Sequence, residues 1–107
     1  MSNKVTITLG NDGQWVCSPD PIPVREANVN LTFLLSTPGY SFASTNAIVV
    51  HDGGSEFPDP SVTKDATTAK LRDKNSKAGR FKYDVNLVRD SDKRPVVIDP
   101  TIENQPK

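Results

Sequence analysis

The chain has 107 residues, 35% of them hydrophobic and 24% charged, and its 13 basic residues balance its 13 acidic residues. That length is enough for one domain with its own core, whereas the zero net charge argues against a nucleic-acid or anionic-membrane binder, because neutralising phosphates needs a surplus of cations. The single cysteine, Cys17, excludes an internal disulfide, and no apolar stretch approaches the roughly 18 residues of a membrane span or resembles a signal peptide. We therefore expect one soluble, cytoplasmic domain over residues 1–107.

Two segments in the first third of the chain alternate apolar and polar side chains, residues 4–9 and residues 28–35. Because successive strand residues point to opposite faces of a sheet, each segment predicts a strand with one face on a core. Between them, the turn sequence at 10–13 predicts a hairpin to a strand at 14–17. The proline-rich segment 18–23 predicts an extended connector, since it cannot form a helix.

The rest of the chain predicts further strands. Residues 47–50 are apolar throughout, as in a strand that is covered on both faces. Residues 65–71 fit either a strand or a short helical turn. Residues 80–87 alternate cleanly, and residues 96–98, with Pro95 at their start, predict a last short strand.

Turn-forming residues separate these segments, at 37–39, 51–60, 74–79 and 90–93. About six to eight short strands at intervals of roughly 8–12 residues are typical of an all-β Greek-key sandwich or a small barrel. We predict a single all-β sandwich, either immunoglobulin-like or cupredoxin-like.

Sandwiches of this size include the copper-binding cupredoxins, so a copper site is the first chemistry to test. A blue-copper centre needs two His, a Cys and usually a Met, with the Cys and one His in the loop before the last strand. That loop, residues 88–94, holds none of these, Cys17 comes far too early, and His51 is the only histidine. We expect no copper, and we assign no metal, catalytic or cofactor site.

Residues 51–60 carry the densest polar chemistry of the chain. As a functional site, the loop is a candidate for binding a small ligand or Ca²⁺, conceivably for hydrolysis, because it combines carboxylates with a histidine and a serine. The simpler interpretation, which we favour, is a surface turn in which Gly supplies positive φ and Asp bonds the backbone. The candidate ligand residues are His51, Asp52, Ser55, Glu56 and Asp59.

Basic residues gather on both sides of the turn at 74–79, where a hairpin of residues 65–71 and 80–87 would place them on its outer face. Such a patch could bind phosphates, but no aromatic side chains are interleaved with it to stack on bases. A solvated outer face, protected from aggregation by lysine, explains the pattern as well. The residues are Lys70, Arg72, Lys74, Lys77, Arg80 and Lys82.

Trp15, Cys17 and Tyr83 are expected in the core. Tyr83 follows Ala78 and Gly79 in the penultimate predicted strand and resembles the tyrosine corner of sandwich folds, whose hydroxyl bonds to nearby backbone. Cys17 lies two residues from Trp15 on the same strand face, and no cation flanks it closely. It is therefore expected to be a small buried hydrophobe rather than a reactive thiol.

The C-terminal residues 99–106 have the sequence D-P-T-I-E-N-Q-P. Together with the preceding hairpin at 79–93 and the short apolar strand, this D-P-x-I-x-N-x-P ending resembles the DP-EP family of small bacterial proteins. The resemblance implies a β-sandwich and brings no catalytic residue with it. We expect residues 99–107 to be ordered, because Ile102 should pack on its own sandwich or on a neighbouring chain.

Two functions remain open. We favour a non-enzymatic binding or assembly module that self-associates, with an unidentified protein as a further partner and with no nucleic-acid or membrane partner. Residues 1–60 carry two basic against six acidic residues, a net −4, and residues 61–107 carry eleven against seven, a net +4, which leaves room for self-complementary contacts. The alternative is the small-ligand or calcium site in the 51–60 loop.

Overall fold

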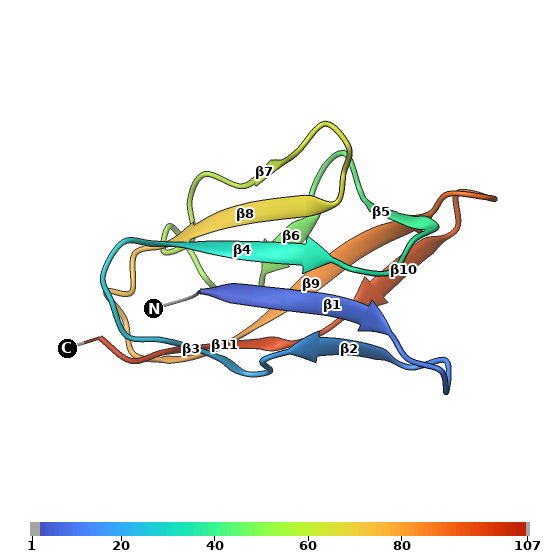
Figure 1. Ribbon diagram of the computed structural model, residues 1–107. Helices are drawn as coiled ribbons and strands as arrows, with labels where there is room; N and C mark the ends of the chain where they lie inside the picture. The colour runs from blue at the N-terminus through green and yellow to red at the C-terminus, as the bar shows by residue number, and fades with distance from the viewer. Residues whose placement is uncertain (1–2, 107) are drawn as a thin grey trace.

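Two β-sheets packed face to face make up the described chain, residues 3–106 of a computed structural model (Figure 1). The strands are β1 (Lys4–Leu9), β2 (Trp15–Ser18), β3 (Ile22–Val24), β4 (Val29–Leu35), β5 (Tyr40–Phe42), β6 (Ile48–Val50), β7 (Ser61–Val62), β8 (Thr68–Asp73), β9 (Gly79–Arg89), β10 (Pro95–Ile98) and β11 (Thr101–Asn104). The first sheet has the order β2-β1-β4-β8-β7, and the second has the order β10-β9-β11-β3, with β5 and β6 also paired to β9. The predicted all-β sandwich is confirmed. None of the residues described forms a helix that could cross a membrane.

The described residues form eleven strands, more than the sequence predicted. The additional ones are short: β3, β5 and β7 have two or three residues each, and β11 has four. Segments of that length contain too few residues for an alternation of period two to stand out, so pattern reasoning passes over them.

The chain passes from the first sheet to the second between β2 and β3. β2 pairs antiparallel with β1, as the predicted hairpin requires, whereas β3 pairs in parallel with the C-terminal strand β11. Two cis peptide bonds, Ser18–Pro19 and Asp20–Pro21, lie in the link. The prolines predict only a connector here, but Pro23 fits a strand because β3 is outermost in its sheet, where proline is tolerated.

The longest strand, β9, organises the second sheet. It pairs with β5 and β6 along one side and with β10 and β11 along the other, so that Leu87 lies opposite both Phe42 and Val96. Strand β10 is thus followed by β11, and the prediction that residues 96–98 form the last strand is wrong.

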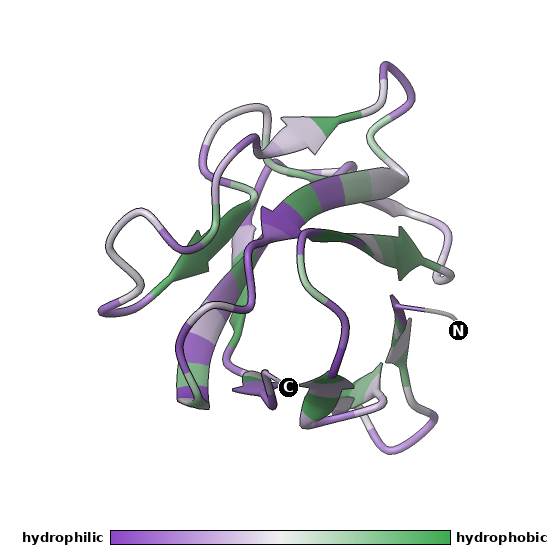
Figure 2. Cartoon of the chain, turned by 90° about the vertical axis from the view of Figure 1, so that its left-hand side faces the viewer, coloured by the Kyte–Doolittle hydropathy of each residue, from purple (hydrophilic) through white to green (hydrophobic). Residues whose placement is uncertain are grey.

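The core consists of the inward-facing side chains of both sheets, and hydrophobic and hydrophilic residues alternate along the strands (Figure 2). Phe33 of β4 and Tyr83 of β9 have no exposed surface, and their ring centroids are 5.4 Å apart, so these two side chains join the sheets. Cys17 is buried, as predicted, and burial raises the pKa of its thiol to about 11. Trp15 is only partly buried and packs edge-on against Tyr40.

The hydroxyl of Tyr83 differs from the prediction. It has no hydrogen-bond partner within the described residues, so the resemblance to a tyrosine corner is wrong. The physical reason is position: Tyr83 lies in the interior of β9, and its ring packs against Phe33 between the two sheets.

The predicted hairpin of basic residues is also wrong. β8 is a strand, which resolves the ambiguity of residues 65–71, but β8 pairs with β4 and β7 in the first sheet while β9 belongs to the second. Residues 74–78 cross from one sheet to the other. The basic side chains of β8 and of β9 therefore lie on different sheets and do not form one patch.

Strand β6 is an outer strand rather than one covered on both faces. It pairs only with β9, and Val49 at its centre is 36% exposed while Ile48 is buried. An apolar run does not by itself distinguish a covered strand from a strand at a sheet edge.

The C-terminal segment has a defined place in the fold up to Pro106, as predicted, and Lys107 lies outside the described residues. Ile102 has no exposed surface and lies opposite both Phe81 and Ile22. Ile102 is expected to pack either on its own sandwich or on a neighbouring chain, and in the structure it packs on its own sandwich.

Candidate functional site

The polar side chains of the 51–60 loop do not converge on one point. His51 lies against Asp84 of β9, on the outside of the second sheet. Glu56 turns inward, and only 4% of its surface is exposed. The loop therefore contributes to two separate polar groups. The other three candidate residues, Asp52, Ser55 and Asp59, are exposed.

The first polar group consists of His51, Asp84 and Asp99. β6 ends beside β9, where the His51 N–H donates to the Lys82 carbonyl at 2.8 Å, and this places the imidazole over the outward face of β9. His51 Nε2 lies 2.9 Å from Asp84 Oδ1. One potential ligand atom from each of the three side chains lies within 4.8 Å of the others.

Imidazole and carboxylates together are ligands that divalent transition metals accept. Here, however, Lys82 already neutralises Asp99, since Lys82 Nζ donates to the Asp99 carbonyl at 2.8 Å and lies 3.5 Å from Asp99 Oδ2. About half of the His51 side chain is exposed. The group is therefore an exposed ion-pair network, in which a metal would have to displace a lysine.

We predict that His51 titrates above its ordinary pKa of 6.5, because Asp84 accepts a hydrogen bond from the imidazole and attracts its charge. A pKa raised in the folded state stabilises the fold below the unfolded value, and that stabilisation is lost as the pH rises through the folded pKa. An NMR titration of the imidazole protons measures it. Asp84→Asn should return the pKa toward 6.5; an unchanged titration in that variant would contradict the assignment.

The second polar group is buried at one end of the sandwich. The Glu56 carboxylate accepts hydrogen bonds from the Ser76 N–H and hydroxyl, both at 2.6 Å, and from the Lys77 N–H at 2.9 Å. Burial alone would raise the pKa of Glu56, but these hydrogen bonds outweigh it and hold the pKa below its ordinary value. The buried members of the group are Glu56, Asp73, Asn75 and Asn104.

Asp73 is held less completely than Glu56. Its Oδ1 accepts from the Asn75 N–H at 2.8 Å and from Asn104 Nδ2 at 3.2 Å, but its Oδ2 meets no donor among the residues described. Burial, reinforced by the negative charge of Glu56, raises the pKa of Asp73. The group thus combines Glu56, whose carboxylate is fully hydrogen-bonded, with Asp73, whose Oδ2 is buried without a hydrogen bond to offset the loss of water.

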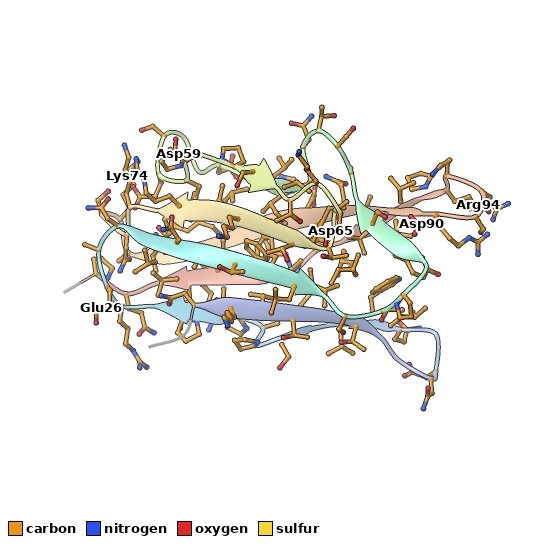
Figure 3. All side chains as sticks on the ribbon, turned by 45° about the horizontal axis from the view of Figure 1, so that its top comes forward. Glu26, Asp59, Asp65, Lys74, Asp90 and Arg94 are labelled. Carbon is orange, nitrogen blue, oxygen red and sulfur yellow. The ribbon has the colours of Figure 1, made fainter. Side chains whose placement is uncertain are left out.

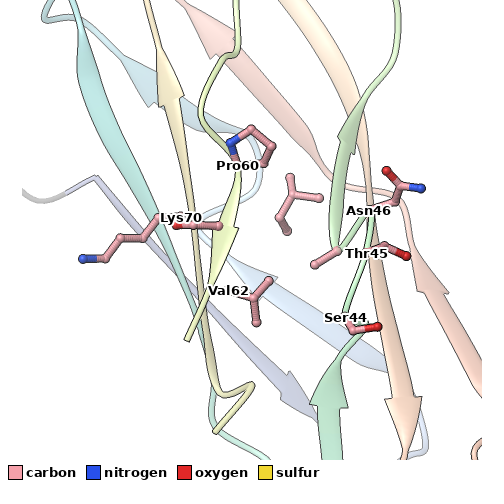
Figure 4. Close-up of a pocket in the computed structure, with 9 residues that line it drawn as sticks. Ser44, Thr45, Asn46, Pro60, Val62 and Lys70 are labelled. Carbon is pink, nitrogen blue, oxygen red and sulfur yellow. The ribbon is translucent and has the colours of Figure 1, made fainter. Parts of the chain in front are cut away.

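A groove of about 270 Å³ lies between β7 and the segment that leads into β6 (Figure 4). It is slightly smaller than the roughly 300–1,000 Å³ of typical ligand pockets. Lys70 is the one ionisable side chain among its lining residues. With so few groups to orient a ligand, the groove provides no chemistry of its own.

Sequence reasoning missed the residues that meet the loop. The alternation of β9 does place Asp84 outward on the same face as Lys82, but nothing local indicates that His51 lies beside them, because the pairing of β6 with β9 joins residues more than 30 positions apart. Of the residues around Glu56, Asp73 and Asn75 do leave a local signal. Their spacing indicates an Asx-type turn, and the Asn75 N–H does donate to Asp73 Oδ1.

No protein-family model matches this chain, and no curated protein matches it either. The resemblance to the DP-EP family therefore stays a prediction that rests on the C-terminal motif.

Proposed function

We propose that this domain is a non-enzymatic binding module that self-associates through strand β10. The observation that carries the proposal is the exposure of Val97, which at 62% exceeds that of the other exposed large hydrophobic residues in the described chain. β10 ends its sheet, so one of its edges has no neighbour. An apolar side chain on an open edge strand is a template for pairing with another chain.

The backbone of Val97 supports the same surface. Val97 lies opposite Asn86, whose N–H donates to the Ala47 carbonyl and whose carbonyl accepts from the Ala43 N–H. Both bonds of Asn86 lie on the side of β9 away from β10. In an antiparallel ladder, opposed residues either exchange both bonds or direct both outward. The N–H and C=O of Val97 therefore face the open edge.

A second copy of the chain fits this edge because the edge is complementary to itself. Two β10 strands related by a twofold axis at Val97 would exchange two hydrogen bonds and bring two valine side chains together.

The other sheet edges are less suited to pairing. β7 has two residues and β3 contains Pro23, and both features protect an edge. β5 and β6 also pair only with β9, but they have three residues each, and Val49 of β6 is 36% exposed. The strongest rival is β2, where Val16 is 52% exposed.

A non-enzymatic role is supported by the partner of the only histidine. His51 Nε2 is bonded to the Asp84 carboxylate rather than to Ser55, so the loop does not present a serine with its base. We further propose that the domain is cytoplasmic. We also propose that it binds no nucleic acid or membrane, which is supported by the distribution of its basic residues over two sheets. The passage of the chain between sheets at β2 and β3 supports an immunoglobulin-like or cupredoxin-like type of Greek key.

We predict that Val97→Lys abolishes self-association. In light scattering behind size exclusion, the mass of the wild-type chain should rise with concentration from 11.7 kDa toward twice that value. The variant should stay at 11.7 kDa, because two lysines would meet at the axis. At concentrations where the wild type is monomeric, the variant should have the same melting temperature, since Val97 is exposed in the single chain.

The matched control is Val16→Lys, an equally drastic change on the open edge of β2. It should associate like the wild type. A wild-type mass that does not change with concentration, or association lost in Val16→Lys and kept in Val97→Lys, would overturn the assignment of β10.

A further inference from the structure

Buried oxygen atoms without donors gather at one end of the sandwich, and we propose that they form a calcium-binding site. The site is built from Glu56, Asp73, Asn75 and Asn104, whose exposed fractions are 4%, 0%, 3% and 2%. Three of their oxygens, Asp73 Oδ2, Asn75 Oδ1 and Asn104 Oδ1, have no hydrogen-bond partner among the described residues. A buried acceptor left without a donor is costly, so three of them in one group of side chains point to a bound species that satisfies them.

The two amides are oriented by their own donors, which fixes where the free oxygens point. Asn75 Nδ2 donates to the carbonyls of Val24 and Glu26, at 3.1 and 3.2 Å. Asn104 Nδ2 donates to Asp73 Oδ1 at 3.2 Å and, more weakly, to Glu56 Oε2 at 3.5 Å. Because both NH₂ groups meet acceptors, flipping either amide would set oxygen against oxygen.

The charge of the group also calls for a cation. Glu56 and Asp73 are both buried carboxylates and lie close enough for the charge of Glu56 to act on Asp73. Within residues 3–106, the ion pairs of the fold involve neither of these two carboxylates. Lys77 attracts the charge of Glu56, but the charge that acts on Asp73 is the negative one of Glu56, and a divalent ion would balance both carboxylates.

The ligand atoms select the kind of cation. All are carboxylate or amide oxygens, which suit hard ions and not Zn²⁺ or copper. Ca²⁺ accepts six to eight oxygens in irregular arrangements, whereas Mg²⁺ requires near-octahedral geometry and usually keeps several waters. A buried group of side chains from separate segments therefore favours Ca²⁺.

The site lies where several connections meet. Glu56 comes from the 51–60 loop, Asn75 from the crossing between β8 and β9, and Asn104 from the end of β11. Glu26, Asp59 and Lys74 mark this end of the molecule, opposite Asp90 and Arg94 (Figure 3). A bound ion would join both sheets and the C-terminal strand, and so would stabilise the folded chain directly.

The test is a titration of the EDTA-treated, full-length protein with CaCl₂. Isothermal calorimetry should show saturable binding of one Ca²⁺ per chain. The melting temperature should rise by roughly 10 °C at a hundredfold excess over the dissociation constant. MgCl₂ at the same concentrations should give a much smaller shift.

Asp73→Asn removes one charged ligand with little change in volume and should weaken Ca²⁺ binding by at least tenfold. The control Asp59→Asn changes an exposed carboxylate in the same loop as Glu56 and should bind like the wild type. The wild-type titration decides the proposal even where Asp73→Asn does not fold. No heat and no change in melting temperature at 10 mM CaCl₂, about tenfold above the weakest dissociation constants of extracellular calcium sites (about 1 mM), would overturn it, and a proton on Asp73 or an internal water would then satisfy these oxygens.

Discussion

Tyr83→Ala is expected to lower the free energy of unfolding by about 3–5 kcal/mol. The Tyr83 side chain has no exposed surface and packs against Phe33, with the ring centroids 5.4 Å apart, at the contact between the two sheets. Removing the ring leaves a cavity that both sheets line, and rigid sheets cannot close it. Urea unfolding measures the loss.

Tyr83→Phe separates the ring from its hydroxyl. Since the hydroxyl is buried without a partner, this change should be neutral or should stabilise the fold by up to about 1 kcal/mol. A loss of about 1 kcal/mol or more in Tyr83→Phe would show that the hydroxyl is bonded after all. Small effects in both variants would mean that β9 is turned by one residue, which would reverse its faces.

A chain truncated after Ile98 should not fold at 25 °C. The truncation removes β11, which lies between β9 and β3, and it leaves β3 without its only partner. It also removes Ile102 from the core. These losses together are comparable to the whole stability of a small domain, about 5–15 kcal/mol. Circular dichroism and the melting curve of the truncated chain test this.

Point changes at Ile102 provide the graded control. Ile102→Ala should destabilise by about 2–5 kcal/mol and Ile102→Val by about 0.5–1.5 kcal/mol, because the side chain is fully buried. A truncated chain with the wild-type melting temperature would contradict the central place of β11.

The candidate sites show where local reasoning stops. The 51–60 loop is recognisable from its composition, and both Glu56 and His51 are candidate ligand residues by their chemistry. Which of them turns inward depends on the Ser76 and Lys77 N–H groups, which the crossing between the sheets brings to Glu56. Those donors lie about 20 residues away in the chain, and no local pattern encodes their approach.

The sequence by itself determined the fold class, the faces of the long strands and the burial of Cys17, Tyr83 and Ile102. Each of these follows from a local rule, because side chains alternate along any extended strand and apolar residues avoid water. Only the tertiary structure decided which strands are neighbours. It placed β8 and β9 on different sheets, made β10 an open edge and gathered the buried oxygens, because strand pairing depends on contacts between distant residues that a period of two leaves undetermined.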